Sequence, residues 1–540
     1  MTHSKLIEAM CRREFYPHRV ENVELIQTHI SYIFIAGDFV YKVKKPVDFG
    51  FLDFTDLKKR KYYCHEEVRL NRRLAPHVYV AVAEIFEDSD GHIALDRGDV
   101  VIEYAVKMKK IPQDRMLKKL FSEERVNLAV MDAIAKKLAV FHRQAETGGM
   151  IDEIGGIATI RKNHDENFAQ TKDSVNITIP GSQYYFIKSY IYDFMARHEP
   201  LLLERVADHR IRDCHGDLHL EHICIMEEES IHRDIDPDSI VIFDCIEFNE
   251  RFRYEDVAAE VAFLAMDLDY NGYPDHADAF VRAYVKHSED HDIYILLNFY
   301  KCYYAYVRGK VVGFRIHDLN IPEAERTDAR RIASRYFELA YIYAARLEKP
   351  TLILISGLMG TGKTIRARHM SSLLGAEVIQ TDALRKEILN MAPTDRHLEA
   401  FGEGIYADAI TRRTYEEALT RAEEELRKRK PVIIDASYKK REDRMKAFDT
   451  AHKLKADFFI IECILNEEII RERLDARMKD TQEASDGRWE IFQEQKKTFE
   501  PITEIPDKSH IIIDASLTPE EGVGKAIAAM KRFPDYGNQV

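Results

Sequence analysis

The chain has 540 residues, of which 45% are hydrophobic and 32% charged, and its formal net charge is −14. This length exceeds what a single hydrophobic core supports, so two or three domains are expected. The composition is typical of a soluble globular protein, the lack of a long apolar run excludes a transmembrane helix, and the acidic front part disfavours nonspecific nucleic-acid binding. Seven cysteines without a C-x-x-C pair predict reduced thiols, and we expect a cytoplasmic protein with no membrane partner.

The first distinctive segment, residues 39–45, reads as a β-strand with inserted lysines. The two-residue period of a strand places Lys42 and Lys44 on the same face. Two interpretations remain open. A lysine on a central strand needs an anion such as a phosphate, whereas lysines on an edge strand protect a sheet from aggregation. The helix predicted next, over 62–75, carries two adjacent glutamates that could pair with a strand lysine.

After a predicted strand at 100–106 and a predicted helix at 127–145, two aspartates stand out. Asp217 lies in the short segment His-Gly-Asp-Leu-His, and Asp244 follows the apolar run 240–243. This order and spacing suit phosphoryl transfer, in which one carboxylate accepts the proton of an attacking hydroxyl and the other holds Mg²⁺ against the phosphates. The alternative is that both aspartates only cap turns.

These segments carry a resemblance to a known family. His215–His219 resembles the H-G-D-x-H catalytic loop of the aminoglycoside phosphotransferase family, and Phe243-Asp244 is similar to its metal-binding strand end. Leu138–His142 and Arg253–Ala258 resemble two further segments of that family. The resemblance spans residues 20–340 and implies an α+β, protein-kinase-like bilobal domain, which we assign to residues 1–346.

The resemblance also implies roles for single residues. By it, Asp217 is the catalytic base, Asp244 a Mg²⁺ ligand, Lys42 the ATP lysine, Glu67 its ion-pair partner, and Glu103–Val106 the adenine hinge. It does not fix the acceptor, since family members phosphorylate antibiotics, choline, sugars and fructosamines.

The front half departs from the family at one metal position. The family usually has Asn five residues after the catalytic Asp, and this chain has His222. A neutral imidazole prefers later divalent metals than Mg²⁺, so we expect His222 to weaken or replace a second metal position. The alternative is that His222 packs outward. No G-x-G-x-x-G loop precedes Lys42, and the tyrosine-rich helices at 280–346 are interpreted as packed core, with an acceptor pocket as the alternative.

The strongest signal in the chain is the segment 357–364, Gly-Leu-Met-Gly-Thr-Gly-Lys-Thr, which has the P-loop form G-x-x-x-x-G-K-[ST]. An apolar strand at 351–356 precedes it and a helix at 365–374 follows. The glycines let backbone N–H groups face phosphate oxygens, Lys363 reaches the β- and γ-phosphates, and Thr364 offers its hydroxyl to Mg²⁺. The nucleotide-binding residues predicted here are Gly357, Gly360, Gly362, Lys363 and Thr364.

Beyond the P-loop, a predicted strand at 377–381 ends at Asp382, and Arg385 follows one helical turn later. A carboxylate and a guanidinium on one face suit a hydroxyl acceptor beside a phosphate, whereas the alternative is that Asp382 only caps its helix. A second strand at 432–435 ends in Asp435, which is placed to position Mg²⁺ through water.

The last part of the chain predicts a lid. After a strand at 458–464 comes an arginine-rich helix with Arg471, Arg473 and Arg477, which can neutralise charge on a transferring phosphoryl group. Arg477 lies nearest the predicted lid and is our candidate. Strands that alternate with helices imply a parallel α/β fold.

Residues 347–540 resemble the small P-loop kinases that include bacteriophage polynucleotide kinase, zeta toxin and gluconate kinase, and the D-x-x-R at 382–385 is similar to the polynucleotide-kinase motif. We therefore interpret the chain as a tandem kinase with two ATP·Mg²⁺ sites and small-molecule hydroxyl acceptors. One alternative is that one half is a regulatory nucleotide-binding module and only the other catalyses. Another is that the P-loop half is a toxin-like or nucleic-acid-end kinase.

Overall fold

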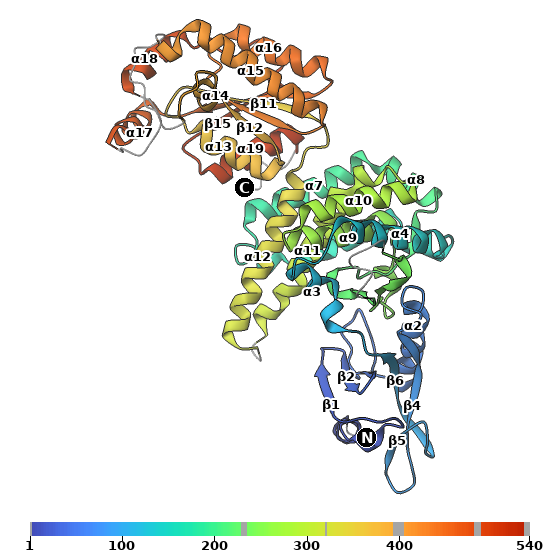
Figure 1. Cartoon of the computed structure of the whole chain (residues 1–540). Helices are drawn as coiled ribbons and strands as arrows, with labels where there is room; N and C mark the ends of the chain where they lie inside the picture. The colour runs from blue at the N-terminus through green and yellow to red at the C-terminus, as the bar shows by residue number, and fades with distance from the viewer. Residues whose placement is uncertain (1–2, 228–234, 319–320, 393–403, 480–487, 534–540) are drawn as a thin grey trace. The chain divides into compact units, whose positions relative to one another are not determined.

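The computed structural model describes residues 3–227, 235–318, 321–392, 404–479 and 488–533 (Figure 1). The chain divides into two compact units, one made of 1–169 with 195–307 and the other of 170–194 with 308–540. The domain boundary predicted at 346/347 stays a prediction. The two compact units change over elsewhere, because 170–194 and 308–346 pack with the P-loop part.

The first unit begins with a six-stranded antiparallel sheet in the order β1-β2-β3-β6-β4-β5. Helix α2 (Leu57–Asn71) packs on one face, and α1 (His3–Met10) packs on the other. The strands are β1 (Val23–Gln27), β2 (Ser31–Ala36), β3 (Phe39–Lys44), β4 (Tyr79–Glu87), β5 (Ile93–Leu95) and β6 (Val100–Lys109).

Strand β3 lies inside this sheet, between β2 and β6. Tyr41 and Val43 belong to the core on the α1 face, so Lys42 and Lys44 point to the opposite face. The interpretation of these lysines as edge-strand residues is therefore wrong, because β3 is hydrogen-bonded to a strand on each side.

The rest of the first unit is mainly helical, with two short antiparallel ladders that pair β7 with β10 and β8 with β9. No helix among the described residues is long and apolar enough to cross a membrane. The elements are α3 (Leu117–Ser122), α4 (Leu128–Gln144), α5 (Met150–Gly155), α6 (Ile157–Gln170), α8 (Glu199–Ala207), β7 (Ile211–Asp213), β8 (Ile223–Ile225), β9 (Ile240–Ile242), β10 (Tyr254–Asp256), α9 (Val257–Tyr270), α10 (Pro274–Ser288) and the first part of α11 (Ile293–Phe314).

The second unit contains a five-stranded parallel sheet in the order β12-β13-β11-β14-β15. Helices α13 and α19 lie on one face, and α15 and α16 on the other (Figure 1). The predicted α/β P-loop fold with a parallel sheet is confirmed. The elements are β11 (Thr351–Ser356), α13 (Lys363–Leu374), β12 (Glu377–Gln380), α14 (Thr381–Ile388), α15 (Asp408–Arg427), β13 (Val432–Asp435), α16 (Arg441–Lys453), β14 (Asp457–Ile464), α17 (Glu467–Lys479), α18 (Trp489–Thr498), β15 (His510–Asp514) and α19 (Pro519–Lys531).

Two helices that precede the P-loop also belong to the second unit, α7 (Gly181–Arg197) and α12 (Glu323–Ala345). The ring of Phe186 on α7 packs edge-on against Phe533 just after α19, with 5.2 Å between ring centroids, and against Tyr341 on α12 at 5.0 Å. Lys531 Nζ donates a hydrogen bond to the carbonyl oxygen of Arg346 at 2.6 Å. Residues ahead of 347 thus complete the packing of the P-loop unit.

Candidate functional site

The P-loop connects the end of β11 to the start of α13. Gly357 has φ +133°, and a Cβ there would lie 2.6 Å from the carbonyl oxygen of Cys463. Gly362 caps α13 in the left-handed conformation with φ +81°. The loop therefore curls as the sequence predicts, and Lys363 Nζ folds into it to donate to the carbonyl oxygen of Leu358 at 3.0 Å. A curled loop at a helix N-terminus presents backbone N–H groups to phosphate.

Beside the loop, the hydroxyl of Thr364 donates to Asp435 Oδ2 at 2.7 Å. Asp435 is the last residue of β13, which runs parallel to β11, so Asp435 and Thr364 meet at the carboxyl ends of these two strands. Burial raises the pKa of Asp435, and the charge of Asp382 adds to the rise, while Lys363 and Thr364 oppose it. A hydroxyl and a carboxylate are oxygen ligands of the type that Mg²⁺ prefers, so this pair fits that ion.

Asp382 and Arg385 lie on the first turns of α14, and Arg385 Nη1 donates to Asp382 Oδ1 at 2.7 Å. The guanidinium is buried and stacks over the ring of Tyr406 at 4.8 Å, whereas the Asp382 side chain is 80% exposed. The N-cap of α14 is Gln380, which makes no capping bond. The helix-cap alternative for Asp382 is therefore wrong, since Asp382 stands inside the helix.

The structure distinguishes among the arginines of α17. The side chain of Arg477 lies outside the described residues, so its predicted role stays a prediction. Arg473 lies beside the P-loop: a Cβ on Gly362 would be 3.6 Å from its Nη1, and its Nη2 donates to the carbonyl oxygen of Ala515 at 3.5 Å. Arg473 precedes Arg477 by four residues in α17, and nothing in the sequence alone favoured it.

In the first unit, the predicted lysine and two carboxylates come together from distant parts of the chain. Lys42 Nζ lies 2.9 Å from Glu67 Oε1 and 2.7 Å from Asp244 Oδ1. Burial disfavours the charged amine, but Asp244 and Glu67 together raise the pKa of Lys42 well above its usual value. Burial also works against the charge of Asp244, but Lys42 holds its pKa well below the usual range. All three groups are thus charged at neutral pH.

Glu67 has a second partner that the sequence did not reveal. Lys44 Nζ lies 2.6 Å from Glu67 Oε2 and also forms an ion pair with Glu247. Lys44 is 1% exposed, and both carboxylates are buried. The cluster joins β3, α2 and the segment after Asp244, so it fixes the position of that segment against the sheet.

Hydrogen bonds to Glu260 on α9 hold the loop that contains Asp217 in place. The Oε1 atom of Glu260 accepts the backbone N–H of His215 at 2.6 Å and of Gly216 at 2.8 Å. Its Oε2 atom lies 2.6 Å from His142 Nε2, and His142 Nδ1 lies 2.6 Å from the Tyr284 hydroxyl. His142, which carried part of the family resemblance, therefore acts as a support of the loop.

Two histidines flank Asp217. His222 Nδ1 lies 2.8 Å from the carbonyl oxygen of Asp217, and His222 Nε2 lies 3.6 Å from Asp244 Oδ2. His219 Nε2 lies 3.6 Å from Asp217 Oδ2. Burial lowers the pKa of His222, and the neighbouring His219 lowers it further, against the opposing carboxylates. The alternative that His222 packs outward is wrong, because its ring lies between the two aspartates, 3.6 Å from a carboxylate oxygen of each.

Glu103 does not occupy the place that the resemblance implies. It lies within β6, where Glu103–Val106 pair with β4 and part of this stretch also pairs with β3. An adenine hinge needs unpaired backbone groups, and these are engaged in the sheet. The buried Glu103 carboxylate binds Arg60 Nε at 2.9 Å. The hinge prediction for Glu103–Val106 is therefore corrected to a structural role.

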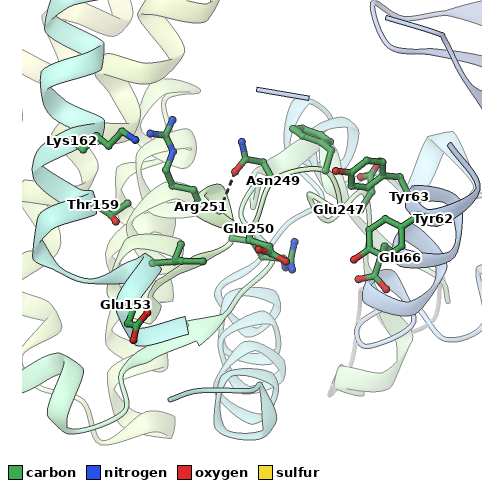
Figure 2. Close-up of a pocket in the computed structure, with 13 residues that line it drawn as sticks. Tyr62, Tyr63, Glu66, Glu153, Thr159, Lys162, Glu247, Asn249, Glu250 and Arg251 are labelled. Atoms are coloured by element: carbon green, nitrogen blue, oxygen red, sulfur yellow. Dashed lines mark hydrogen bonds between the residues drawn. The ribbon is translucent and has the colours of Figure 1, made fainter. Parts of the chain in front are cut away.

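An open cleft of about 590 Å³ lies next to the buried ion-pair cluster of Lys44, Glu67 and Glu247, and Glu247 is part of its lining (Figure 2). Tyr62, Tyr63 and Glu66 on α2 form one wall, and residues of α5 and α6 form the other. The segment 247–253, which follows Asp244, lies between them. This segment is held by Arg251, whose guanidinium donates two hydrogen bonds to Glu166 at 2.9 and 2.8 Å.

The tyrosines of the helical part are mostly core. Tyr284, Tyr300, Tyr304 and Tyr306 are buried, and Tyr294 is half exposed. The packed-core interpretation is thus confirmed for these four. All seven cysteines lie among the described residues, and none of them forms a disulfide.

The glycine loop with Thr364 and Asp435 at the edge of a parallel sheet defines a P-loop nucleotide-binding domain, and residues 352–502 match the family described as AAA domain. Uncharacterized proteins of Mycobacterium tuberculosis and Mycobacterium bovis are each 30% identical over 461 residues, which cover 84% of this chain and 86% of the relative. The chain belongs to the same family as these mycobacterial proteins. The resemblance of its front half to aminoglycoside phosphotransferases stays a prediction.

Several solved structures are similar to part of the chain. A gluconokinase from Sinorhizobium meliloti 1021 is 19% identical, with a TM-score of 0.25, and covers 35% of this chain and 96% of its own. Shikimate kinase from Aquifex aeolicus is 16% identical, with a TM-score of 0.23, and covers 34% and 96%. TM-scores this low carry no conclusion about the substrate.

Proposed function

We propose that the chain is a tandem phosphotransferase with two ATP·Mg²⁺ sites, each of which moves a γ-phosphoryl group to a hydroxyl acceptor. The observation that carries this proposal is that each unit places a lysine in the same site as a carboxylate suited to a metal. Lys42 contacts Asp244 at 2.7 Å in one unit, and Lys363 lies in the P-loop whose Thr364 binds Asp435 at 2.7 Å in the other. ATP with Mg²⁺ supplies the transferable phosphoryl group when bound.

In the front half, the proposed roles follow from charge and position. Lys42 contacts phosphate oxygens, Glu67 holds Lys42 in place, and Asp244 is the metal ligand. Asp217, on the loop that Glu260 anchors, accepts the proton of the acceptor hydroxyl. An antiparallel sheet with α2 packed on one face and α1 on the other, followed by helices and two short ladders, supports the protein-kinase-like fold that the resemblance implies.

In the P-loop half, the loop N–H groups and Lys363 bind the phosphates, and Thr364 with Asp435 holds the metal. Asp382 activates the acceptor hydroxyl, and Arg385 orients Asp382 through their ion pair. Either Arg473 or Arg477 of α17 neutralises charge on the moving phosphoryl group.

The acceptor of the front half is a small molecule with a hydroxyl group. The cleft beside 247–253 supports this choice, since its size is that of small-molecule sites and it combines tyrosine rings with carboxylates. For the P-loop half, the Asp382–Arg385 pair also suits a phosphate-bearing acceptor, so a nucleic-acid end is the second candidate.

Calorimetric titration of the full chain with a nonhydrolysable ATP analogue and Mg²⁺ tests the two-site claim. We expect two equivalents to bind, one to be lost in Lys42→Met, the other in Lys363→Ala, and both in the double variant. If the wild type binds only one equivalent of the analogue and Lys42→Met still binds one, the front half has no ATP site and the two-site claim is refuted. A screen of hydroxyl metabolites and oligonucleotides with γ-labelled ATP, run on each single variant, then assigns acceptors to halves.

A further inference from the structure

The hydrogen bond between His222 and Asp217 fixes the tautomer of His222. Its Nδ1 lies 2.8 Å from the Asp217 carbonyl oxygen, and a carbonyl oxygen can only accept. Nδ1 therefore carries the hydrogen, and in the neutral ring Nε2 keeps its lone pair. That lone pair belongs to a ring that is 13% exposed, so it is held in a set direction rather than solvated freely.

His222 Nε2 faces Asp244 Oδ2 at 3.6 Å. The other oxygen of this carboxylate, Oδ1, is bound by Lys42 at 2.7 Å, so Lys42 and His222 lie on different oxygens of Asp244. A neutral nitrogen and a carboxylate oxygen are both electron-pair donors and repel each other across such a gap. A cation between them turns the repulsion into two attractive bonds.

The spacing fits one ion. Two ligand atoms that each lie about 2.1 Å from a metal are about 3.0 Å apart at a right angle and about 3.6 Å apart at roughly 118°. At the observed 3.6 Å one ion can contact both atoms, at an angle wider than the 90° of a regular octahedron. Two protein ligands leave the remaining positions for phosphate oxygens and water.

His219 has the opposite tautomer and serves as a natural comparison. Its Nδ1 accepts the backbone N–H of Glu221 at 3.3 Å, so its Nε2 carries the hydrogen. That nitrogen lies 3.6 Å from Asp217 Oδ2. In this tautomer neither ring nitrogen of His219 offers a free lone pair to a metal, although the His219 and His222 rings are only 4.0 Å apart.

We propose that His222 Nε2 and Asp244 Oδ2 form a mixed nitrogen–oxygen site for a divalent cation and that this site prefers Mn²⁺ to Mg²⁺. The preference follows from the imidazole ligand, because nitrogen ligands favour the later first-row metals whereas Mg²⁺ favours oxygen. The inference deepens the proposed function of the front half and rests on it only for the role of the metal, not for its binding.

Electron paramagnetic resonance of Mn²⁺ tests the site without any reaction. The full chain carries Asp435→Asn to weaken the P-loop metal position, and Mn²⁺ is added alone. We expect bound Mn²⁺ to show hyperfine coupling to one imidazole nitrogen in pulsed spectra. His222→Asn should abolish this coupling and weaken Mn²⁺ binding by about tenfold or more, while leaving Mg²⁺ competition little changed. His219→Asn should keep the coupling and most of the Mn²⁺ affinity of the parent protein.

The outcomes separate the competing explanations. The proposal is overturned if the parent protein shows no nitrogen coupling, or if His219→Asn and His222→Asn behave alike. If the Mn²⁺–nitrogen coupling is present but the front half binds no nucleotide, the metal site is supported and the assignment of the front half as a kinase is rejected. Nucleotide binding without coupling rejects the metal site alone. His222→Gln is a second variant without the imidazole. If its circular dichroism spectrum matches that of the parent protein, a loss of coupling in it cannot come from a folding defect.

Discussion

Removing the carboxylate of Glu260 should destabilise the first unit strongly. In Glu260→Ala, the backbone N–H groups of His215 and Gly216 lose their acceptor, and His142 loses its partner, all in buried surroundings. Each buried group left without a partner costs about 1–3 kcal/mol, so the two N–H groups alone account for about 2–6 kcal/mol. That is a large part of the usual stability of a domain, about 5–15 kcal/mol.

Glu260→Gln should cost about half as much, because its amide oxygen still accepts the two N–H groups but without charge. The net pKa of Glu260 is lowered: burial raises it, but His142 and the loop lower it more. A carboxyl with a lowered folded pKa stabilises the protein above its unfolded value of about 4.3 and loses that effect as pH falls through the folded pKa. The wild type should therefore weaken in acid more steeply than Glu260→Gln.

Urea unfolding followed by far-ultraviolet circular dichroism measures the loss, and fluorescence of Trp489, the single tryptophan of the chain, reports on the second unit. Glu221→Ala is the matched control, since this exposed carboxylate of the same loop pairs with Lys118 on the surface and should cost under about 1 kcal/mol. A Glu260→Ala protein within 1 kcal/mol of the wild type would refute the reasoning that Glu260 anchors the loop.

Three further predictions concern buried charge, backbone shape and the P-loop metal pair. Lys44→Met should destabilise the first unit by about 3–5 kcal/mol in urea unfolding, because it leaves two buried carboxylates with less compensation; a loss below 1 kcal/mol would contradict this. Gly216→Ala should cost about 2–4 kcal/mol, since φ is +83° and the new Cβ would lie 2.6 Å from the carbonyl oxygen of Phe252. Gly272→Ala, with φ +90° and open space, should cost only the backbone part, about 1–2 kcal/mol; equal losses would argue against the close contact. Asp435→Asn should lower Mg²⁺-dependent ATP affinity by about 10–100-fold in calorimetry. It should also make the nucleotide-free protein more stable than the wild type as pH rises above the unfolded carboxyl pKa of about 3.9, because burial raises the pKa of Asp435 and its ionisation then opposes folding; a variant that is less stable there would contradict that sign.

The P-loop half was predictable because its information is local. A strand, a glycine loop and a helix follow one another within 25 residues, and β13 was predicted at 432–435, where the structure has Val432–Asp435. Parallel strands then bring Asp435 to Thr364 without further information. The helix that carries Asp382 begins at Thr381, one residue before the predicted boundary.

The front half shows where local patterns stop. The lysine face of β3 was predicted from its two-residue period, but Glu247 lies 203 residues from Lys44, and no period reveals such a pairing. The adenine-hinge prediction for Glu103–Val106 was wrong because a strand pattern does not show which backbone groups are hydrogen-bonded to a neighbouring strand. The start of α2 was placed too late, since the basic run after Leu57 hides the apolar period; Asp56, which accepts the N–H of Lys58, was the signal for it.

The interleaving of the two units sets an order on the synthesis of the chain. Residues 195–307, which complete the first unit, leave the ribosome before most of the second unit exists. Helix α7 is made earlier still, yet Phe186 packs on Phe533, which follows about 350 residues later, a delay of about 20–70 s at about 5–20 residues per second. During that interval the Phe186 ring lacks its partner Phe533, and transiently exposed apolar side chains of this kind make a nascent chain prone to aggregation. A truncated message would leave α7 in that state permanently.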